Sequence, residues 1–183
     1  RPDCLRTEIL DLLERLNQII TVWVGLGLQT IHERTARYIR RGYDLPVFET
    51  AVSELRRRGI DVIVHTILCL PGETKPDMLQ TIQYLNRQDI QGIKLQLLHI
   101  LKGTDLAEIY ASDPFPVPDP QEYYELLGSC ISHLRPDIVI HRLTGDGPKE
   151  LLTAPLWTCN KRQVLNQLQS YFKTHDIWQG KEY

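Results

Sequence analysis

The sequence lacks closely spaced cysteines. Its four cysteines stand at positions 4, 69, 130 and 159, so no two have the spacing of a zinc or iron–sulfur half-site. They are also too sparse for a small disulfide scaffold. There is no amino-terminal signal pattern and no apolar run long enough to cross a membrane. These absences predict a reduced, cytoplasmic protein without membrane contact.

An excess of charge of one sign is missing as well. The 183 residues carry 21 Lys and Arg against 23 Asp and Glu, a formal net charge of −2. This balance disfavours a dedicated nucleic-acid binder, and 42% hydrophobic residues exclude a disordered tail. The chain is too short for a complete (β/α)₈ barrel, which takes about 250 residues. It begins with Arg1 rather than methionine, which predicts that it is a piece of a longer protein.

The first half of the sequence alternates helical and strand patterns. Amphipathic spacing predicts helices at residues 8–17, 30–41 and 46–58. Apolar runs of strand length predict strands at residues 20–28, 60–70 and 93–101. Thr74 is a good N-cap for a further helix. Strands and helices that alternate with short connections are typical of βαβ units, so we expect an α/β fold with a parallel sheet.

The second half of the sequence opens with a proline-rich segment. Proline stands at every second position from 114 to 120, which excludes a helix or a central strand and predicts an extended connection at 112–120. Beyond it, residues 121–183 predict a C-terminal αβα extension, with a helix at 121–134, a strand at 138–143 and a helix at 161–173.

The strand ends carry the residues best suited to binding. In an open parallel sheet, ligands bind beyond the carboxyl ends of the strands. Four segments with glycine and polar residues are expected there: 27–30, 69–74, 98–104 and 142–147. A lone glycine is more often a turn, and a histidine such as His65 inside an apolar strand is more often a core residue. Four such segments at one edge nevertheless predict a site, and strand alternation puts His65, Ile67 and Cys69 on one face.

These segments together resemble the radical SAM superfamily. The resemblance rests on Gly27-Leu28-Gln29-Thr30, Arg41-Gly42, residues 65–74, residues 94–104 and residues 141–147. Within the superfamily the sequence is similar to the YhcC/YtqA-type subfamily, which is related in its core to elongator-type enzymes. The C-terminal pattern also matches, at Trp157, Asn160-Lys161 and Gln179-Gly180-Lys181. The resemblance covers nearly the whole chain and is silent on the substrate.

The resemblance implies a fold and two cofactors. Residues 1–111 would form the C-terminal half of an open, partial TIM-type radical SAM barrel, with residues 121–183 packed on it. S-adenosylmethionine (SAM) would lie at the strand ends beside a 4Fe–4S cluster and supply a 5′-deoxyadenosyl radical. The cysteines that ligate the cluster are expected on a loop before residue 1, so this chain would hold no metal ligand and would be inactive alone.

The resemblance also implies which residues hold SAM. Gln29 matches a polar residue near the ribose, and Arg41 matches an arginine that pairs with the methionine carboxylate, a task that suits a guanidinium. His65 matches a polar side chain at the ribose hydroxyls. The stretch from Ile67 to Leu70 matches the apolar strand end that packs on adenine.

Two positions depart from the family pattern. Cys69 stands where glycine is usual, and its side chain is expected to crowd the adenine. Gly25 stands where we expect glutamate, so one candidate contact is missing. Both departures predict altered cofactor binding.

Other readings stay open. The kinship with elongator-type enzymes makes tRNA a candidate substrate, with the arginines at 34, 37, 40 and 41 as its basic patch, although a solvated helix face explains these arginines more simply.

A non-catalytic α/β interaction module is the main alternative. A phosphate-binding enzyme that uses 144–147 is disfavoured, because neither G-x-x-x-x-G-K-[ST] nor G-x-G-x-x-G is present. An unpaired edge on the strand at 20–28 would make the isolated chain self-associate.

Overall fold

The computed structural model describes residues 1–145 and 147–183. Its helices are α1 (Thr7–Asn17), α2 (Glu33–Tyr38), α3 (Leu45–Arg57), α4 (Lys75–Leu85), α5 (Asp105–Ser112), α6 (Pro120–His133) and α7 (Lys161–Thr174), with 3-10 turns η1 (Pro2–Cys4), η2 (Lys149–Leu151) and η3 (Leu156–Cys159). Its strands are β1 (Trp23–Gln29), β2 (Asp61–Leu68), β3 (Gly92–Leu97), β4 (Ile100–Leu101), β5 (Val139–Arg142) and β6 (Leu152–Ala154).

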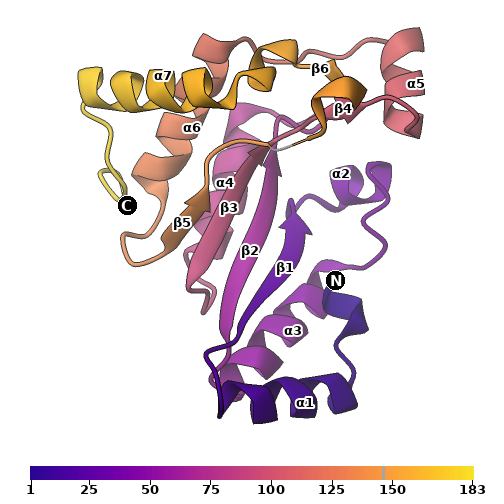
Figure 1. Ribbon diagram of the computed structural model, residues 1–183, viewed down its shortest axis with the longest axis vertical. Coiled ribbons are helices and arrows are strands. Elements are labelled where there is room, and N and C mark those ends of the chain that lie inside the picture. The colour runs from indigo at the N-terminus through magenta and orange to yellow at the C-terminus, as the bar shows by residue number, and fades with distance from the viewer. Residues whose placement is uncertain (146) are drawn as a thin grey trace.

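Four strands form one parallel sheet, in the order β1-β2-β3-β5 (Figure 1). This arrangement confirms the expected α/β class. Within the described residues the sheet stays open, with β1 and β5 as its edges, and does not close into a barrel. A small antiparallel pair, β4 and β6, lies beyond the carboxyl ends of the strands.

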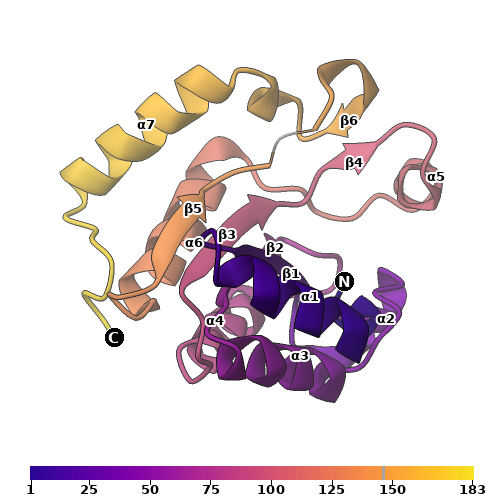
Figure 2. The same cartoon turned by 60° about the horizontal axis from the view of Figure 1, so that its bottom comes forward.

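The core lies between the sheet and three helices on one of its faces. In β2 the buried side chains Val62, Val64 and Leu68 point toward α3, α4 and α6, because alternate residues of a strand face the same side. Figure 1 shows these helices along that face, and Figure 2 shows α1 beside α3. The opposite face of the sheet is only partly covered. We call it the open face, and it carries Gly25, His65 and Lys94.

Two predicted strands have different limits in the structure. The strand expected from residue 20 begins at Trp23, because the Asn17 side chain accepts a hydrogen bond from Val22 N at 2.9 Å and holds the chain in a turn. Ile20 is therefore 62% exposed. The strand expected at 93–101 is broken after Leu97, where the chain leaves the sheet and pairs with β6 instead.

The helix expected at 30–41 is shorter, and one helix was not predicted. Only residues Glu33–Tyr38 are helical, because the Thr30 hydroxyl accepts from His32 N at 3.1 Å and holds the chain in a turn before the helix. Helix α5 was missed, although Thr104 caps it by accepting a hydrogen bond from Ala107 N. A single eight-residue helix between a strand and a proline run carries little periodic signal.

The parallel sheet contains strands from both sides of the proline-rich segment. Residues 113–119 contain no helix or strand, as predicted, and α6 begins after them with a capping box in which Asp119 and Glu122 each accept the other's backbone N–H. Strand β5 then pairs with β3 of the first half. The division into residues 1–111 and 121–183 stays a prediction, and both parts share one core.

The segment after α7 is docked on the rest of the chain. Gln179 Nε2 donates to the carbonyls of Arg135 at 2.8 Å and Ile138 at 2.7 Å, and Gly180 N donates to Ile131 O at 3.2 Å. Gly180 has a φ of +81°, and a Cβ there would lie 2.4 Å from Pro136 Cγ. Glycine is required at this position for both reasons.

We predict that Gly180→Ala lowers the free energy of unfolding by about 2 to 4 kcal/mol, because it combines a left-handed backbone with a steric clash. Gly103→Ala is the matched control, since Gly103 has a φ of +77° but nothing within 4 Å of an added Cβ. That variant should lose only about 1 kcal/mol. Urea denaturation measures both, and equal losses would contradict the docking of Gly180 against Pro136.

Candidate functional site

A cavity opens at the carboxyl ends of β1 and β2. Its volume is about 590 Å³, within the range of small-molecule sites. Of the residues predicted to bind a cofactor, Gln29, Arg41, Ile67 and Leu70 all line it. The third predicted rim segment reaches it through Leu98 and Thr104. Residues that are distant in the sequence therefore line the same cavity.

A residue with a left-handed backbone stands at the carboxyl end of each of the two strands, as the last residue of β1 and as the residue directly after β2. Gln29 has a φ of 61° and Cys69 a φ of 63°. Such conformations are unfavourable for residues other than glycine and tend to cluster at binding sites. At Gln29 the backbone reversal turns the carboxamide back over Gly27, where an added Cβ would lie 2.6 Å from Gln29 Nε2. The polar side chain is thus held on the cavity wall.

Tyr43 supports this wall from the side. Its hydroxyl donates to the Gly27 carbonyl and lies 3.4 Å from Gln29 Oε1. Burial raises the pKa of Tyr43, so the phenol stays protonated and able to donate. This role of Tyr43 was not predicted, because a single tyrosine after a glycine belongs to no sequence pattern.

Arg41 holds together the segments that frame the cavity. Its side chain is 2% exposed, and its guanidinium donates to Thr30 O at 2.8 Å, Tyr43 O at 2.8 Å and Leu28 O at 3.3 Å. It also forms an ion pair with Glu33 Oε1 at 2.8 Å, an oxygen that accepts from Leu45 N as well. Arg41 therefore ties the end of β1 to the starts of α2 and α3. A cofactor carboxylate would have to share this guanidinium with Glu33.

Cys69 does not line the cavity. Strand β2 ends at Leu68, and the reversed backbone carries Cys69 off the face that holds His65 and Ile67. Its side chain packs on the core near Tyr123 and Cys130, and burial raises the thiol pKa to about 12. The expected crowding of a ligand by this thiol is therefore not supported. The left-handed φ gives a different reason why glycine suits this position.

His65 lies below the cavity, on the open face. It pairs in register with Gly27 on one side and Lys94 on the other, and Gln96 Nε2 lies 3.4 Å from its Nδ1. Burial, then the positive charges of Lys94 and Arg142, lower the pKa of the imidazole. An added Cβ at Gly25 would lie 3.0 Å from His65 Nε2, so any larger residue at position 25 would press on the ring.

Two more charged groups lie near the strand ends, Arg40 from the predicted basic patch and Glu73 from the predicted rim segment 69–74. Arg40 forms an ion pair with Asp105 of α5 at the edge of the cavity, and both side chains are largely exposed. Glu73, in the loop after β2, is half-buried, and burial raises the pKa of its carboxyl against the opposing effect of the Thr30 and Thr35 hydroxyls.

The fourth predicted rim segment lies elsewhere. Its residues Arg142, Leu143 and Thr144 line a separate hollow beside the C-terminal segment, and Gly145 lies against the His99 ring. Asp146, also in this segment, lies outside the described residues. Three of the four segments, rather than four, therefore meet at the cavity.

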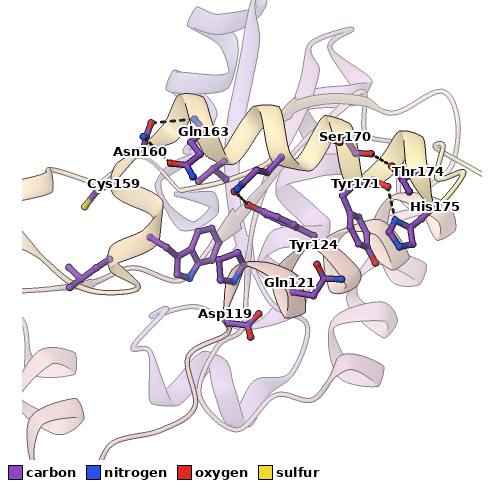
Figure 3. Close-up of a pocket in the computed structure, with 15 residues that line it drawn as sticks. Asp119, Gln121, Tyr124, Cys159, Asn160, Gln163, Ser170, Tyr171, Thr174 and His175 are labelled. Carbon is purple, nitrogen blue, oxygen red and sulfur yellow. Dashed lines mark hydrogen bonds between the residues drawn. The ribbon is translucent and has the colours of Figure 1, made fainter.

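A second hollow is an open groove of about 860 Å³ between α6 and α7 (Figure 3). Its polar groups are bonded to one another: Tyr124 Oη donates to Gln167 Oε1 at 2.9 Å, and Trp157 Nε1 donates to Pro118 O at 3.0 Å. None of the predicted cofactor-binding residues lines it. The groove is explained by the packing of the two helices.

Within residues 1–145 and 147–183, no three His, Cys, Asp or Glu side chains are grouped so that they could hold a metal ion. All four cysteines are free thiols. Among the helices of the same residues, none is both long enough and apolar enough to span a membrane.

Comparison with known proteins identifies relatives over the whole chain. The model of the radical SAM superfamily matches residues 1–85, and that of the Radical SAM C-terminal domain matches residues 90–174. Uncharacterized protein YtqA of Bacillus subtilis is 39% identical over 99% of this chain and 56% of its own length. Protein YhcC of Escherichia coli is 35% identical over 97% of this chain and 58% of its own. The chain thus spans little more than half of these relatives.

A solved structure supports the fold. The archaeal Methanocaldococcus infernus Elp3, with an N-terminal deletion, superposes with a TM-score of 0.82 over 98% of this chain and 41% of its own. The sequence identity is 17%, so the likeness concerns the fold alone.

We predict that Arg41→Ala lowers the free energy of unfolding by about 3 kcal/mol, because it removes the ion pair with Glu33 and the hydrogen bonds to three backbone carbonyls. Arg37→Ala, at an exposed position of the neighbouring helix α2, should change it by less than about 0.5 kcal/mol. Urea denaturation measures both variants. A loss in Arg41→Ala no greater than in Arg37→Ala would show that the bonds of Arg41 do not hold this region together.

Proposed function

Because the chain belongs to the radical SAM superfamily, we propose that the protein it comes from is a radical SAM enzyme that binds SAM in the cavity at the ends of β1 and β2. One observation supports this most strongly. Gln29, Arg41, Ile67 and Leu70, which the resemblance assigned to the cofactor from separate motifs, line a single cavity of suitable volume. When bound and reductively cleaved, SAM supplies a 5′-deoxyadenosyl radical that abstracts hydrogen from a substrate.

In this proposal each residue has a separate task. Ile67 and Leu70 form the apolar wall against adenine and exclude water from it, because both project from the end of β2 into the cavity. Gln29 offers its carboxamide to the ribose, in an orientation fixed by Tyr43 and the left-handed backbone. His65 lies on β2 two residues before Ile67 and does not line the cavity, so it receives no contact with the cofactor in this proposal. Arg41 attracts the methionine carboxylate and positions the end of β1.

The described residues do not supply a cluster site, since no three suitable ligands are grouped among them. We propose that the 4Fe–4S cluster is held by a part of the protein that corresponds to the remainder of YtqA and YhcC, and we derive no step through it. The free thiols suit a reducing compartment, and we propose the cytoplasm.

We propose tRNA as the substrate class for which some structural support exists. Arg34 and Arg37 are exposed on α2, beside the exposed Tyr38 and the rim of the cavity, so cationic and aromatic groups are adjacent. The Elongator complex protein 3 sequences and the Elp3 structure are distant relatives. Weaker tRNA binding by Arg34→Ala/Arg37→Ala than by Lys173→Ala, in a gel-shift assay, would support this assignment.

A non-catalytic interaction module remains the alternative. The exposed apolar residues of α1 and the free edge of β1 favour it, because such surfaces pair with other chains. Iron and sulfide analysis of the full-length gene product, purified without oxygen, separates the two functions. About four irons per chain would support the enzyme, and their absence would support the module.

We predict that Ile67→Ala, made in the full-length protein, weakens SAM binding about tenfold, because the apolar wall against adenine loses three carbons. Val139→Ala is the control, since Val139 is also a β-branched strand residue but lies on β5 away from the cavity. Anaerobic calorimetry measures the affinity. Equal affinities of the Ile67→Ala and Val139→Ala proteins would remove Ile67 from the site.

We also predict that the isolated 183-residue chain self-associates and binds no iron. Strand β1 pairs only with β2 among the described strands, and Ile20 and the neighbouring residues of α1 are exposed beside its edge. Ile20→Lys should restore a monomer in light scattering. Leu156→Lys, at an equally exposed position of η3, should not. A monomeric parent chain, or stoichiometric iron in it, would contradict this prediction.

A further inference from the structure

The open face carries a cluster of basic and polar side chains below the cofactor cavity. In register, His65 of β2 lies beside Lys94 of β3, and Ile67 lies beside Gln96. Residues paired across parallel strands project to the same side, so these side chains form two adjacent rows. Lys94 and Gln96 interrupt the buried pattern of β3, where the residues between and around them are buried. They occupy a part of the sheet that a core would normally fill with apolar side chains.

Lys94 has no acidic neighbour in the four strands of the sheet. The only acidic residue in the four strands is Asp61, the first residue of β2, and it forms an ion pair with Arg56 of α3 at 2.9 Å. Among the described residues, no carboxylate forms an ion pair with Lys94. The charged groups near His65 are Lys94, Arg142 and His141, all cations or potential cations. Lys94 is partly buried, and a ligand with a negative charge would balance its ammonium.

The open face curves around the cluster. The rings of Trp23 on β1 and His141 on β5 meet edge-to-face at 5.6 Å, although these are the two outer strands, so the sheet curves strongly. Gly92 permits this contact, because a Cβ there would lie 2.6 Å from His141 Nε2. On β1, Gly25 gives room to the His65 ring, and Gly27 gives room to the Gln29 carboxamide.

From this arrangement we infer that Lys94, with His65 and Gln96, forms a binding site for an oxyanion, a carboxylate or phosphate group of the substrate. The ammonium supplies the charge, and the imidazole and the carboxamide supply further hydrogen bonds. The cavity at the strand ends and the oxyanion site share β2. His65 precedes Ile67 by two residues, which is about 7 Å along the strand. A substrate anchored at Lys94 would therefore extend upward to the cofactor.

The identification of the ligand as a substrate rests on the proposed function, but the oxyanion site does not. It is formed by residues of this chain alone, so it can be tested without SAM or a cluster. Failure of the chain to bind an anion would overturn this inference and leave the cofactor cavity untouched. Failure of the full-length protein to bind SAM would overturn the proposed function and leave the oxyanion site.

The experiment is an NMR titration, with ¹⁵N-labelled histidine, of the 183-residue chain that carries Ile20→Lys, the substitution expected to keep it monomeric. Inorganic phosphate and acetate are added in separate series, with sodium chloride at matched ionic strength as the blank. A bound anion stabilises the imidazolium, so the pKa of His65, which its cationic neighbours lower, should rise by about half a pH unit or more. The series with the tighter binding identifies the substrate group as phosphate or carboxylate.

Variants locate the anion. Lys94→Met should weaken binding about tenfold, and Lys94→Arg should restore most of it, because the charge returns. Lys173→Met, at an exposed position in the last turn of α7, is the control and should bind like the parent chain. If Lys94→Met does not fold, Lys94→Gln replaces it. A His65 pKa unmoved by either anion, or equal binding by Lys94 and Lys173 variants, would overturn the inference.

Discussion

The buried guanidinium of Arg41 is the interaction on which the functional end of the molecule depends. A charged group with 2% of its side chain exposed is stable only if its donors find acceptors, and here they do so in three separate segments. Two of the acceptors, the carbonyls of Leu28 and Thr30, lie at the point where β1 ends and its ladder no longer uses them. The end of β1 therefore supplies acceptors that allow Arg41 to be buried.

The structure around Arg41 follows from these hydrogen bonds. The chain reverses at Gln29, which frees the strand end from the sheet and leaves a hollow rather than a continued ladder. Glu33 balances the charge and accepts from the first turn of α3 as well, so the helix that covers the core begins at a fixed place. The cavity is thus rigid on the side of β1, while its other side is formed by α5 and the exposed Arg40–Asp105 pair. Charge pairs of that exposed kind contribute little to stability, so the two sides differ in how firmly they are held.

Local patterns allowed much of the fold to be predicted. The apolar run of β2 and the cap of α4 at Thr74 needed only periodicity and capping chemistry, and both are found in the structure. The limits of β1 and the break between β3 and β4 were missed, since they depend on hydrogen bonds from Asn17 and on pairing with β6. At the site, Gln29, Ile67 and Leu70, which the resemblance assigned to the cofactor, line one cavity, and their contacts with a cofactor stay proposals. The internal partners of Arg41 are mostly backbone carbonyls, which no sequence pattern reveals.

The docked C-terminal segment has a consequence for folding during translation. Gln179 bonds to the carbonyls of Arg135 and Ile138, which form the turn immediately before β5. This edge strand is therefore not secured until residues some forty positions later have been synthesised. Strands β1 to β3 and the helices between them are complete long before that point, and domains commonly fold from the amino-terminal side during translation. The nascent chain can thus form the cavity at the ends of β1 and β2 first, whereas β5 gains its hydrogen bonds to Gln179 only after that residue has been synthesised.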